Sequence, residues 1–280
     1  MRPLDLPVSA RRRDLRLSPG PTGLRPRVLI TGSAGVVATI LARDLSRDHD
    51  LIGLDVQQIR EPEYWSDTIE VSVGERDTVL KFATEADYVL HLAHDSCGGW
   101  AGLREVEIDG TRNVLDGATR GSCRRVVIAS SNHVTGWSEL DYLAGMPVEL
   151  PLEPSAPLRP DGLYGVAKIT GEALGRAAAE FSGLPVSVLR IGTVRLDDDV
   201  DKAVAEDEFA YIGGREAVRR RLNRSWLFHG DLIRYVREEF AALETFRLRY
   251  ASSAEDEIWS ARTLTWMAPH HVGGPNDSPR

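Results

Sequence analysis

The fold of this chain is decided by Arg27-Val-Leu-Ile-Thr31-Gly32-Ser-Ala-Gly35-Val-Val-Ala38, where an apolar run leads through a glycine turn into an amphipathic, helix-like segment. Gly32 permits the tight turn, and Gly35 lets the backbone approach a pyrophosphate group. Ala38 is small enough for close packing of the helix on the strand. The pattern Gly-x-x-Gly-x-x-Ala therefore predicts a strand, a phosphate-binding loop and a helix.

A carboxylate ends the next predicted strand, Leu51-Ile-Gly-Leu-Asp55. It lies about twenty residues after the glycine loop, where dinucleotide-binding folds place the ligand of the adenosine ribose. The Asp55 carboxylate can accept hydrogen bonds from ribose hydroxyls and would repel a 2′-phosphate. We therefore predict that NAD is bound in preference to NADP.

Strands and helices alternate along the rest of the chain. Short apolar runs at 88–92, 126–129 and 186–189 are typical of buried strands, and residues 103–118 and 164–181 have helical periodicity. This alternation predicts an α/β fold, a doubly wound parallel sheet whose ligands lie beyond the carboxyl ends of the strands. Four candidate site residues stand at such ends, namely Thr31, Asp55, Leu92 and Ser131.

Two segments carry the groups needed for hydride chemistry, Ser130-Ser131-Asn132-His133 and Tyr164-Gly-Val-Ala-Lys168. Residues four apart share a helix face, so Tyr164 and Lys168 project side by side. A free tyrosine titrates near ~10, and a neighbouring ammonium favours the phenolate, which can exchange a proton with a substrate hydroxyl. Ser131 would hydrogen-bond the same oxygen. An isolated Tyr-x-x-x-Lys is also common as a solvated pair, but the glycine loop and the alternation favour the catalytic interpretation.

With these motifs in place, the chain resembles the extended short-chain dehydrogenases of the NAD-dependent epimerase/dehydratase family, from about Arg27 to Pro269. Within that family it is most similar to the uronate dehydrogenases. Its most specific parts are Ala129-Ser-Ser-Asn-His133, Arg159-Pro-Asp-Gly-Leu-Tyr-Gly-Val-Ala-Lys168 and Leu189-Arg-Ile-Gly192. The resemblance implies oxidation of a small sugar acid, most simply a hexuronate at C1, to an aldarolactone.

The resemblance also implies roles for single residues. The catalytic set would be Ser131, Tyr164 and Lys168. Contacts to the sugar would come from Ser96, Ser131, Asn132, His133, Thr193 and Arg221, with the register of Arg221 open among Arg219, Arg220 and Arg224. Contacts to NAD would come from Gly32, Ala34, Gly35, Val36, Asp55, Ser72, Val73, Leu92, Ala93, Tyr164 and Lys168.

Three departures from the family pattern bear on this transfer. The family's asparagine after the fourth strand is Glu107 here, so a proton relay through that position would differ. Ser72 replaces an acidic residue that commonly contacts the adenine, which predicts weaker or different base contacts. An acidic insertion over 196–218 precedes Arg221 and could form a lid. The alternatives are therefore a reductase or dehydrogenase of another small metabolite, a sugar-nucleotide epimerase or dehydratase, and a non-catalytic NAD-binding regulator.

Composition limits the setting. The chain has 280 residues, 42% of them hydrophobic, and a formal charge of −8, which disfavours a nucleic-acid surface. Two cysteines are too few for a disulfide scaffold and suit a reducing cytoplasm, and no apolar stretch approaches a membrane span. We predict a disordered arm over 1–26, one Rossmann-type domain over 27–270 with its substrate lobe mainly from 193–270, and a loose tail over 271–280. A homodimer or higher homo-oligomer is expected from the resemblance alone.

Some residue clusters favour a structural interpretation. A metal is not expected at His91, His94, Asp95 and Cys97, because no second ligand cluster accompanies them. Residues 197–201 resemble the start of a calcium loop, but Lys202 stands where the turn needs glycine, so a solvated acidic loop is expected. Trp226, Trp259 and Trp266 are expected in the core.

Overall fold

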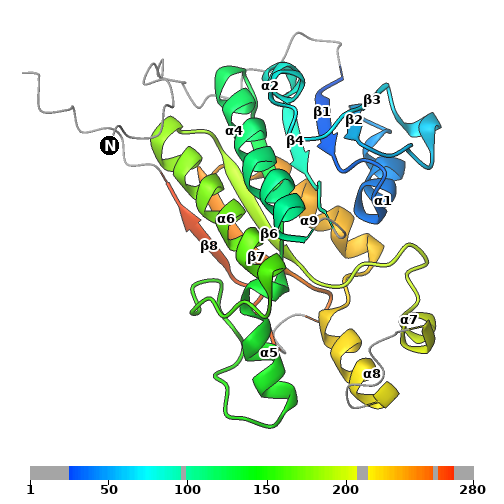
Figure 1. The fold of residues 1–280 in the computed structure, drawn as a ribbon, viewed down its shortest axis with the longest axis vertical. Helices are drawn as coiled ribbons and strands as arrows, with labels where there is room; N and C mark the ends of the chain where they lie inside the picture. Colours follow the sequence, from blue (N-terminus) through cyan, green and yellow to red (C-terminus); the bar gives the residue numbers. More distant parts are fainter. Residues whose placement is uncertain (1–24, 96–98, 207–213, 255–257, 268–280) are drawn as a thin grey trace, which may run out of the picture.

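The centre of the molecule is an eight-stranded sheet (Figure 1). The structure is a computed structural model that describes residues 25–95, 99–206, 214–254 and 258–267. Neighbouring strands follow the order β3 (Asp67–Glu70), β2 (Asp50–Asp55), β1 (Arg27–Thr31), β4 (Tyr88–His91), β5 (Arg125–Ser131), β6 (Val186–Ile191), β7 (Phe246–Ala251) and β8 (Thr263–Trp266). Among the strands of the described ranges, β7 and β8 are the one antiparallel pair. The predicted doubly wound parallel sheet is confirmed, with an antiparallel strand at one edge.

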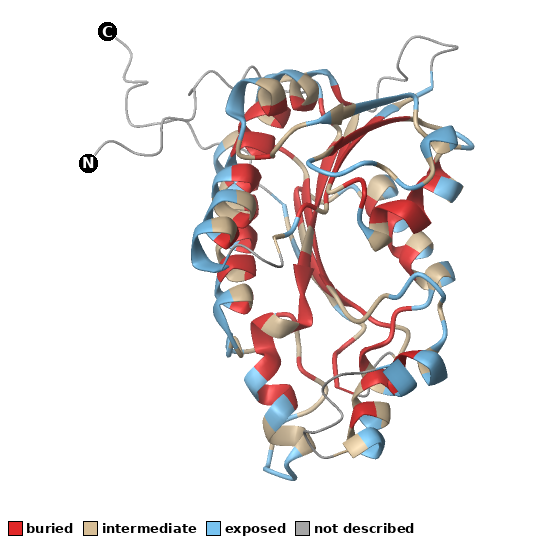
Figure 2. Ribbon diagram, turned by 45° about the vertical axis from the view of Figure 1, so that its right-hand side comes forward, coloured by how far each residue is buried: buried red, intermediate tan, exposed pale blue. Residues whose placement is uncertain are grey.

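Helices cover both faces of the sheet. One face carries α2 (Arg76–Glu85), α4 (Thr111–Arg120) and α6 (Leu163–Ser182), and the other carries α1 (Val36–Leu45) and α9 (His229–Ala241). The first layer packs on the sheet through residues such as Val79, Val114 and Ala179, and the second through residues such as Leu41 and Leu232. Figure 2 shows these two buried layers as red bands along the strands and the inner sides of the helices.

The predicted strands and helices are present, and one helical segment contains an irregularity that was not predicted. The strands predicted at 51–55, 88–92, 126–129 and 186–189 are β2, β4, β5 and β6, and the helix predicted over 164–181 is α6. The stretch 103–118 is helical as predicted, but it spans the end of α3 (Gly99–Leu103), the π-helical segment η2 (Arg104–Gly110) and most of α4. A π-helical turn holds an extra residue, and such turns recur at functional sites. Here the turn carries the buried Glu107.

The acidic stretch at 197–199 is a largely exposed loop, as expected, and ion pairs and hydrogen bonds tie it to its neighbours. Asp197 pairs with Lys202 at 2.6 Å, and Asp198 accepts hydrogen bonds from the indole of Trp226 and the backbone of His229, both at 3.1 Å. The stretch leads into α7 (Val200–Glu206), which packs with α8 (Gly214–Ser225) around Trp226. The rest of the insertion, 207–213, lies outside the described residues.

The segment 193–270, which we assigned to a substrate lobe, contributes partly to the main sheet and its helices and partly to a small separate core. α9, β7 and β8 belong to the layers of the main sheet, whereas α7 and α8 have a small core of their own. Trp226 and Trp259 are buried as expected, and Trp266 packs on the core from the edge strand β8 while remaining partly exposed. Residues 1–24 and 268–280 lie outside the described part, so the predicted arm and tail stay predictions.

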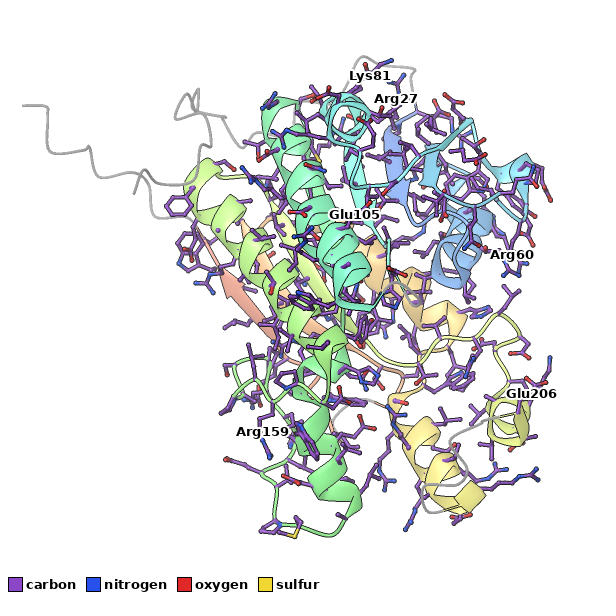
Figure 3. All side chains as sticks on the ribbon, in the orientation of Figure 1. Arg27, Arg60, Lys81, Glu105, Arg159 and Glu206 are labelled. Carbon is purple, nitrogen blue, oxygen red and sulfur yellow. The ribbon has the colours of Figure 1, made fainter. Side chains whose placement is uncertain are left out.

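The direction of the strands fixes where a ligand site can lie. β1 begins at Arg27, which Figure 3 shows near Lys81 at one end of the molecule. Arg159 and Glu206 lie at the opposite end, toward which the parallel strands run. α5 (Gly136–Leu143), α7 and α8 lie at that end too.

Among the described residues, none of the helices is both long and apolar enough to cross a membrane. The cytoplasmic location stays a prediction.

Candidate active site

The glycine loop between β1 and α1 has the backbone that its sequence predicts. Gly32 has a φ of +71°, and a Cβ there would stand 2.7 Å from backbone atoms of Leu92 and Ala93. A side chain at this position would therefore force the loop to move. Gly35 caps α1 without any side-chain hydrogen bond. Because the first amide groups of a helix need acceptors and favour an anion, the loop fits the pyrophosphate of a dinucleotide.

Asp55 fixes this loop and retains acceptor capacity. Its Oδ2 accepts a hydrogen bond from the backbone of Ala34 at 2.9 Å, and its Oδ1 accepts one from Gln57 at 2.9 Å. Each carboxylate oxygen has a further lone pair, so the ribose hydroxyls can still bind. The residues present therefore fit NAD, with the start of α1, including Val36, at the pyrophosphate and Asp55 at the adenosine ribose.

The region after β3 contains an acidic group that the sequence did not predict there. Ser72 Oγ donates to Glu105 Oε1 at 2.9 Å, and Gly74 N donates to Ser72 Oγ at 3.1 Å. Glu105 comes from the π-helical segment and is labelled in Figure 3. Ser72 thus replaces the family's acidic residue in the sequence, while another segment brings a carboxylate beside it. The adjoining Val73 is buried.

Helix α6 places Tyr164 and Lys168 together as predicted. The Lys168 Nζ lies 5.6 Å from the centre of the Tyr164 ring and donates a hydrogen bond to the Ala129 carbonyl at 2.8 Å. Lys168 is only 5% exposed. A buried ammonium beside a phenol suits the phenolate form that proton abstraction needs.

Glu107, the departure from the family pattern, pairs with this lysine. Its Oε2 lies 2.8 Å from Lys168 Nζ, and its Oε1 lies 2.8 Å from His94 Nδ1. Burial disfavours the Glu107 carboxylate, but the charge of Lys168 and the hydrogen bond with His94 outweigh it and hold the pKa of Glu107 below its usual value. Burial also disfavours the Lys168 ammonium, yet the Glu107 carboxylate raises the pKa of Lys168 above its usual value. The pair is therefore an ion pair at neutral pH.

The turn after β5 carries the sugar-contact candidates. Ser131 Oγ accepts a hydrogen bond from the His133 backbone at 3.3 Å and donates one to Asn132 Oδ1 at 3.3 Å. The turn itself, η3 (Asn132–Thr135), packs against α6. The ring of His133 lies 5.5 Å from that of Tyr164. The structure thus brings Ser131, Asn132 and His133 to the helix that bears Tyr164.

Two histidines flank Tyr164, and each is bonded to a carboxylate. The His94 ring centre lies 4.6 Å from that of Tyr164, and His94 is bonded to Glu107. On the other side, His133 Nδ1 lies 2.7 Å from Asp161 Oδ2. A carboxylate at Nδ1 fixes the orientation of the ring and directs Nε2 elsewhere. Asp161 therefore orients His133, although the sequence analysis gave it no role.

Arg221 also reaches a carboxylate. Its Nε donates to Glu139 Oε1 at 3.1 Å, and Glu139 Oε2 accepts from Asn132 Nδ2 at 3.2 Å. Glu139 lies on α5 and is 3% exposed. Thr193 approaches the end of α8, where its Oγ1 lies 2.8 Å from Ser225 Oγ.

The resemblance to the family left open which arginine of α8 would contact the sugar. The alternatives to Arg221 have different surroundings. Arg219 is bonded to Asp201, and Arg224 stacks over the ring of Tyr142 with its Cζ 5.5 Å from the ring centre. Arg220 is exposed. Arg221 is therefore the arginine of α8 that shares a partner with Asn132.

A buried ion pair holds α6 on the sheet. Arg190 of β6 donates from Nε and Nη2 to the two oxygens of Glu172 on α6, both at 2.9 Å. Ser130 Oγ donates to the same carboxylate at 2.5 Å. Bidentate pairs of this kind fix geometry as well as charge. The ion pair therefore fixes the helix of Tyr164 and Lys168 on β6, and the Ser130 hydrogen bond fixes it on β5, the strand that ends at Ser131.

Some candidates were missed and one cannot be placed. His94, Glu139 and Asp161 were given no role at this site, although Asp161 stands within the quoted motif before Tyr164. Ser96 and Cys97 lie outside the described residues. His91 lies between the hydroxyls of Thr31 and Thr111 at 2.8 and 2.9 Å. Within the described ranges, no group of three or more His, Cys, Asp or Glu side chains is arranged to hold a metal.

The glycine loop, Asp55 and the Tyr164–Lys168 pair together define a Rossmann-type NAD-dependent dehydrogenase. The model of the NAD dependent epimerase/dehydratase family matches residues 28–205. That match covers more than half of the sequence, and the chain belongs to this family.

Two curated relatives are dehydrogenases of free sugars. The chain is 34% identical over 212 residues to an L-arabinose 1-dehydrogenase (NAD(P)(+)) of Haloferax volcanii, covering 73% of this chain and 78% of that protein. It is 24% identical over 236 residues to a uronate dehydrogenase of Agrobacterium fabrum, covering 83% of this chain and 79% of that protein.

A solved structure supports the fold. The uronate dehydrogenase from Agrobacterium tumefaciens superposes with a TM-score of 0.68 at 24% identity, covering 84% of this chain and 80% of that one. Family, fold and cofactor are thereby settled. The roles of the single site residues stay predictions.

Proposed function

We propose that the protein oxidises a free sugar at its anomeric carbon and passes the hydride to NAD, giving a lactone. The observation that supports this most is the placement of Tyr164, beside the Lys168 ammonium and next to the turn that carries His133. Bound NAD would supply the hydride acceptor. Tyr164 would take the proton of the anomeric hydroxyl while the hydride leaves the same carbon, and loss of both forms the lactone carbonyl.

The remaining residues would bind and orient the sugar. Ser131 would hydrogen-bond the reacting oxygen, and Asn132 and His133 would hold neighbouring hydroxyls. Lys168 would support the phenolate of Tyr164 and hold the nicotinamide ribose. Ser96, predicted as a further sugar contact, keeps that status.

The substrate predicted from the sequence is a hexuronate, which would give an aldarolactone. Arg221, with Thr193 beside α8, would then receive the sugar carboxylate. The uronate dehydrogenase among the relatives supports this assignment. A neutral aldose is the second candidate, because Arg221 is already bonded to Glu139 and another relative is named for L-arabinose.

The test is direct. Purified protein is mixed with NAD and, in separate reactions, galacturonate, glucuronate, galactose, glucose and arabinose, and reduced cofactor is followed by absorbance. We expect reduction with at least one of these sugars. If all five are inactive while a sugar nucleotide or another alcohol is turned over, the proposed function is wrong and one of the alternative activities of the fold takes its place.

A further inference from the structure

The charges around Tyr164 favour one substrate class over the other. Building on the proposed C1 oxidation, we propose that the substrate is a neutral aldose and that Glu139 is the residue that selects it, by cancelling the charge of Arg221. The predicted role of Arg221 as the receptor of a sugar carboxylate would then be replaced by hydrogen bonding to a hydroxyl.

Three basic side chains of the site each lie beside a different carboxylate. Lys168 Nζ lies 2.8 Å from Glu107, His133 Nδ1 lies 2.7 Å from Asp161, and Arg221 Nε lies 3.1 Å from Glu139. These pairs come from different segments of the fold. Acidic partners at all three positions leave no uncompensated cation among them for an anionic sugar.

The two cations Lys168 and Arg221 are each already paired with a nearly buried carboxylate, Glu107 and Glu139, and a third carboxylate, Asp161, lies at His133. A hexuronate would bring a further negative charge close to these carboxylates, and like charges repel each other. A neutral aldose brings no charge. Its hydroxyls can use the same donors and acceptors without that repulsion.

The Glu139 carboxylate is buried and held by two hydrogen bonds. Its side chain is 4% exposed, while that of Arg221 is 36% exposed, so the carboxylate lies beneath the arginine. Its second oxygen holds Asn132 at 3.2 Å, and Asn132 is itself a predicted sugar contact. A buried carboxylate is costly without a cation, so Arg221 cannot leave it for a ligand without a penalty. The same carboxylate thus positions Asn132 and neutralises Arg221.

The first experiment uses sugars that differ only at C6. The kcat/KM of the wild-type protein is measured with galactose against galacturonate and with glucose against glucuronate, all with NAD. We expect the neutral member of the active pair to be preferred by at least about tenfold, the size of one modest charge interaction. A preference for the uronate overturns the proposal but leaves C1 oxidation intact. Inactivity with every sugar would instead overturn the proposed function.

The second experiment removes the charge that the proposal invokes. Glu139→Gln keeps the size of the side chain and one acceptor oxygen for Arg221 or Asn132, but it removes the negative charge and leaves the arginine charged. The ratio of uronate to neutral-sugar kcat/KM should rise about tenfold, mainly through the KM of the uronate. Asp141→Asn, on the same helix and paired with the exposed Arg159, is the matched control and should leave the ratio unchanged. An equal loss with both sugars would mean that Glu139 is only structural.

Salt provides a test that needs no variant. Added salt screens charge interactions, so a repelled uronate should show a lower KM at high ionic strength, whereas an attracted uronate should show a higher one. The KM of the neutral sugar is the internal control. A uronate KM that rises with salt contradicts the proposal even if Glu139→Gln fails to fold.

Discussion

The two halves of the site are built in different ways. In the cofactor half, formed by the β1–α1 loop and β2, Asp55 holds the backbone of Ala34, 21 residues away in the chain. In the proposed sugar half, formed by η3, α5 and α8, Glu139 holds the side chain of Arg221, 82 residues away. Backbone geometry with local spacing sets the cofactor half, whereas side-chain charge pairs between distant segments set the sugar half. Cofactor identity is therefore visible in a motif, and sugar identity is not.

The largest effect is expected from removing the Tyr164 hydroxyl, which should sharply lower turnover without affecting NAD binding. Tyr164→Phe deletes the proton acceptor but keeps the ring between His94 and His133. We expect kcat to fall by roughly 10²–10⁴-fold, the usual contribution of general base catalysis, while NAD affinity measured by calorimetry stays near the wild-type value. Unchanged turnover would favour a non-catalytic NAD-binding regulator or a different base.

Glu107→Gln tests whether the Lys168 pair depends on charge. The amide can still contact Lys168 and His94, but the buried ammonium loses its counter-charge, and breaking a buried ion pair costs about 3–5 kcal/mol. Urea unfolding near neutral pH should show a free energy of unfolding lowered by about that amount. Asp109→Asn, on the same π-helical segment and paired with the exposed Arg104, is the control. A wild-type stability for Glu107→Gln would show that the pair contributes little.

His91, at the end of β4, gives the stability of the fold a dependence on pH. Burial lowers the pKa of His91 to about 4, so the unfolded chain binds the proton first as the pH falls. Stability from this group is present above the unfolded pKa near 6.5 and is lost between there and about 4, by roughly 3 kcal/mol. Unfolding free energies measured across that range should therefore fall with acid. His91→Gln, which can still bridge Thr31 and Thr111, should reduce the slope, and an unchanged slope would assign it to other groups.

The smallest effect is expected at the loop carboxylate. Asp55→Asn weakens the hydrogen bond to the Ala34 backbone and those to the ribose, and charge-assisted bonds contribute about 1.5–3 kcal/mol each. We expect the KM for NAD to rise roughly 10–100-fold, with a smaller change for NADP because the repulsion of its phosphate is removed. Sugar selectivity measured at saturating cofactor should not change. A change in that selectivity would mean that the two halves are coupled.

The parts that sequence reasoning recovered are those in which neighbours in the chain form the structure. The glycine loop, the strand that ends at Asp55, and the Tyr164–Lys168 pair follow from strand and helix periodicity, because residues one helical turn apart must meet. The π-helical turn at Glu107 was missed, since its pattern is that of an ordinary amphipathic helix. The adenine contacts were predicted from Ser72 alone. The carboxylate of Glu105 beside Ser72 was missed, because the two residues come from separate segments of the chain.

The sequence by itself determined the class of fold, the cofactor and the hydride chemistry, because each depends on short spacings that the backbone converts directly into geometry. Only the tertiary structure decided which carboxylate stands beside which basic side chain. Folding brought Glu107 to Lys168, Asp161 to His133 and Glu139 to Arg221. Charge interactions depend on distance in space and on burial rather than on separation along the chain. The sugar selectivity that we propose therefore depends on contacts that form only when the chain is folded.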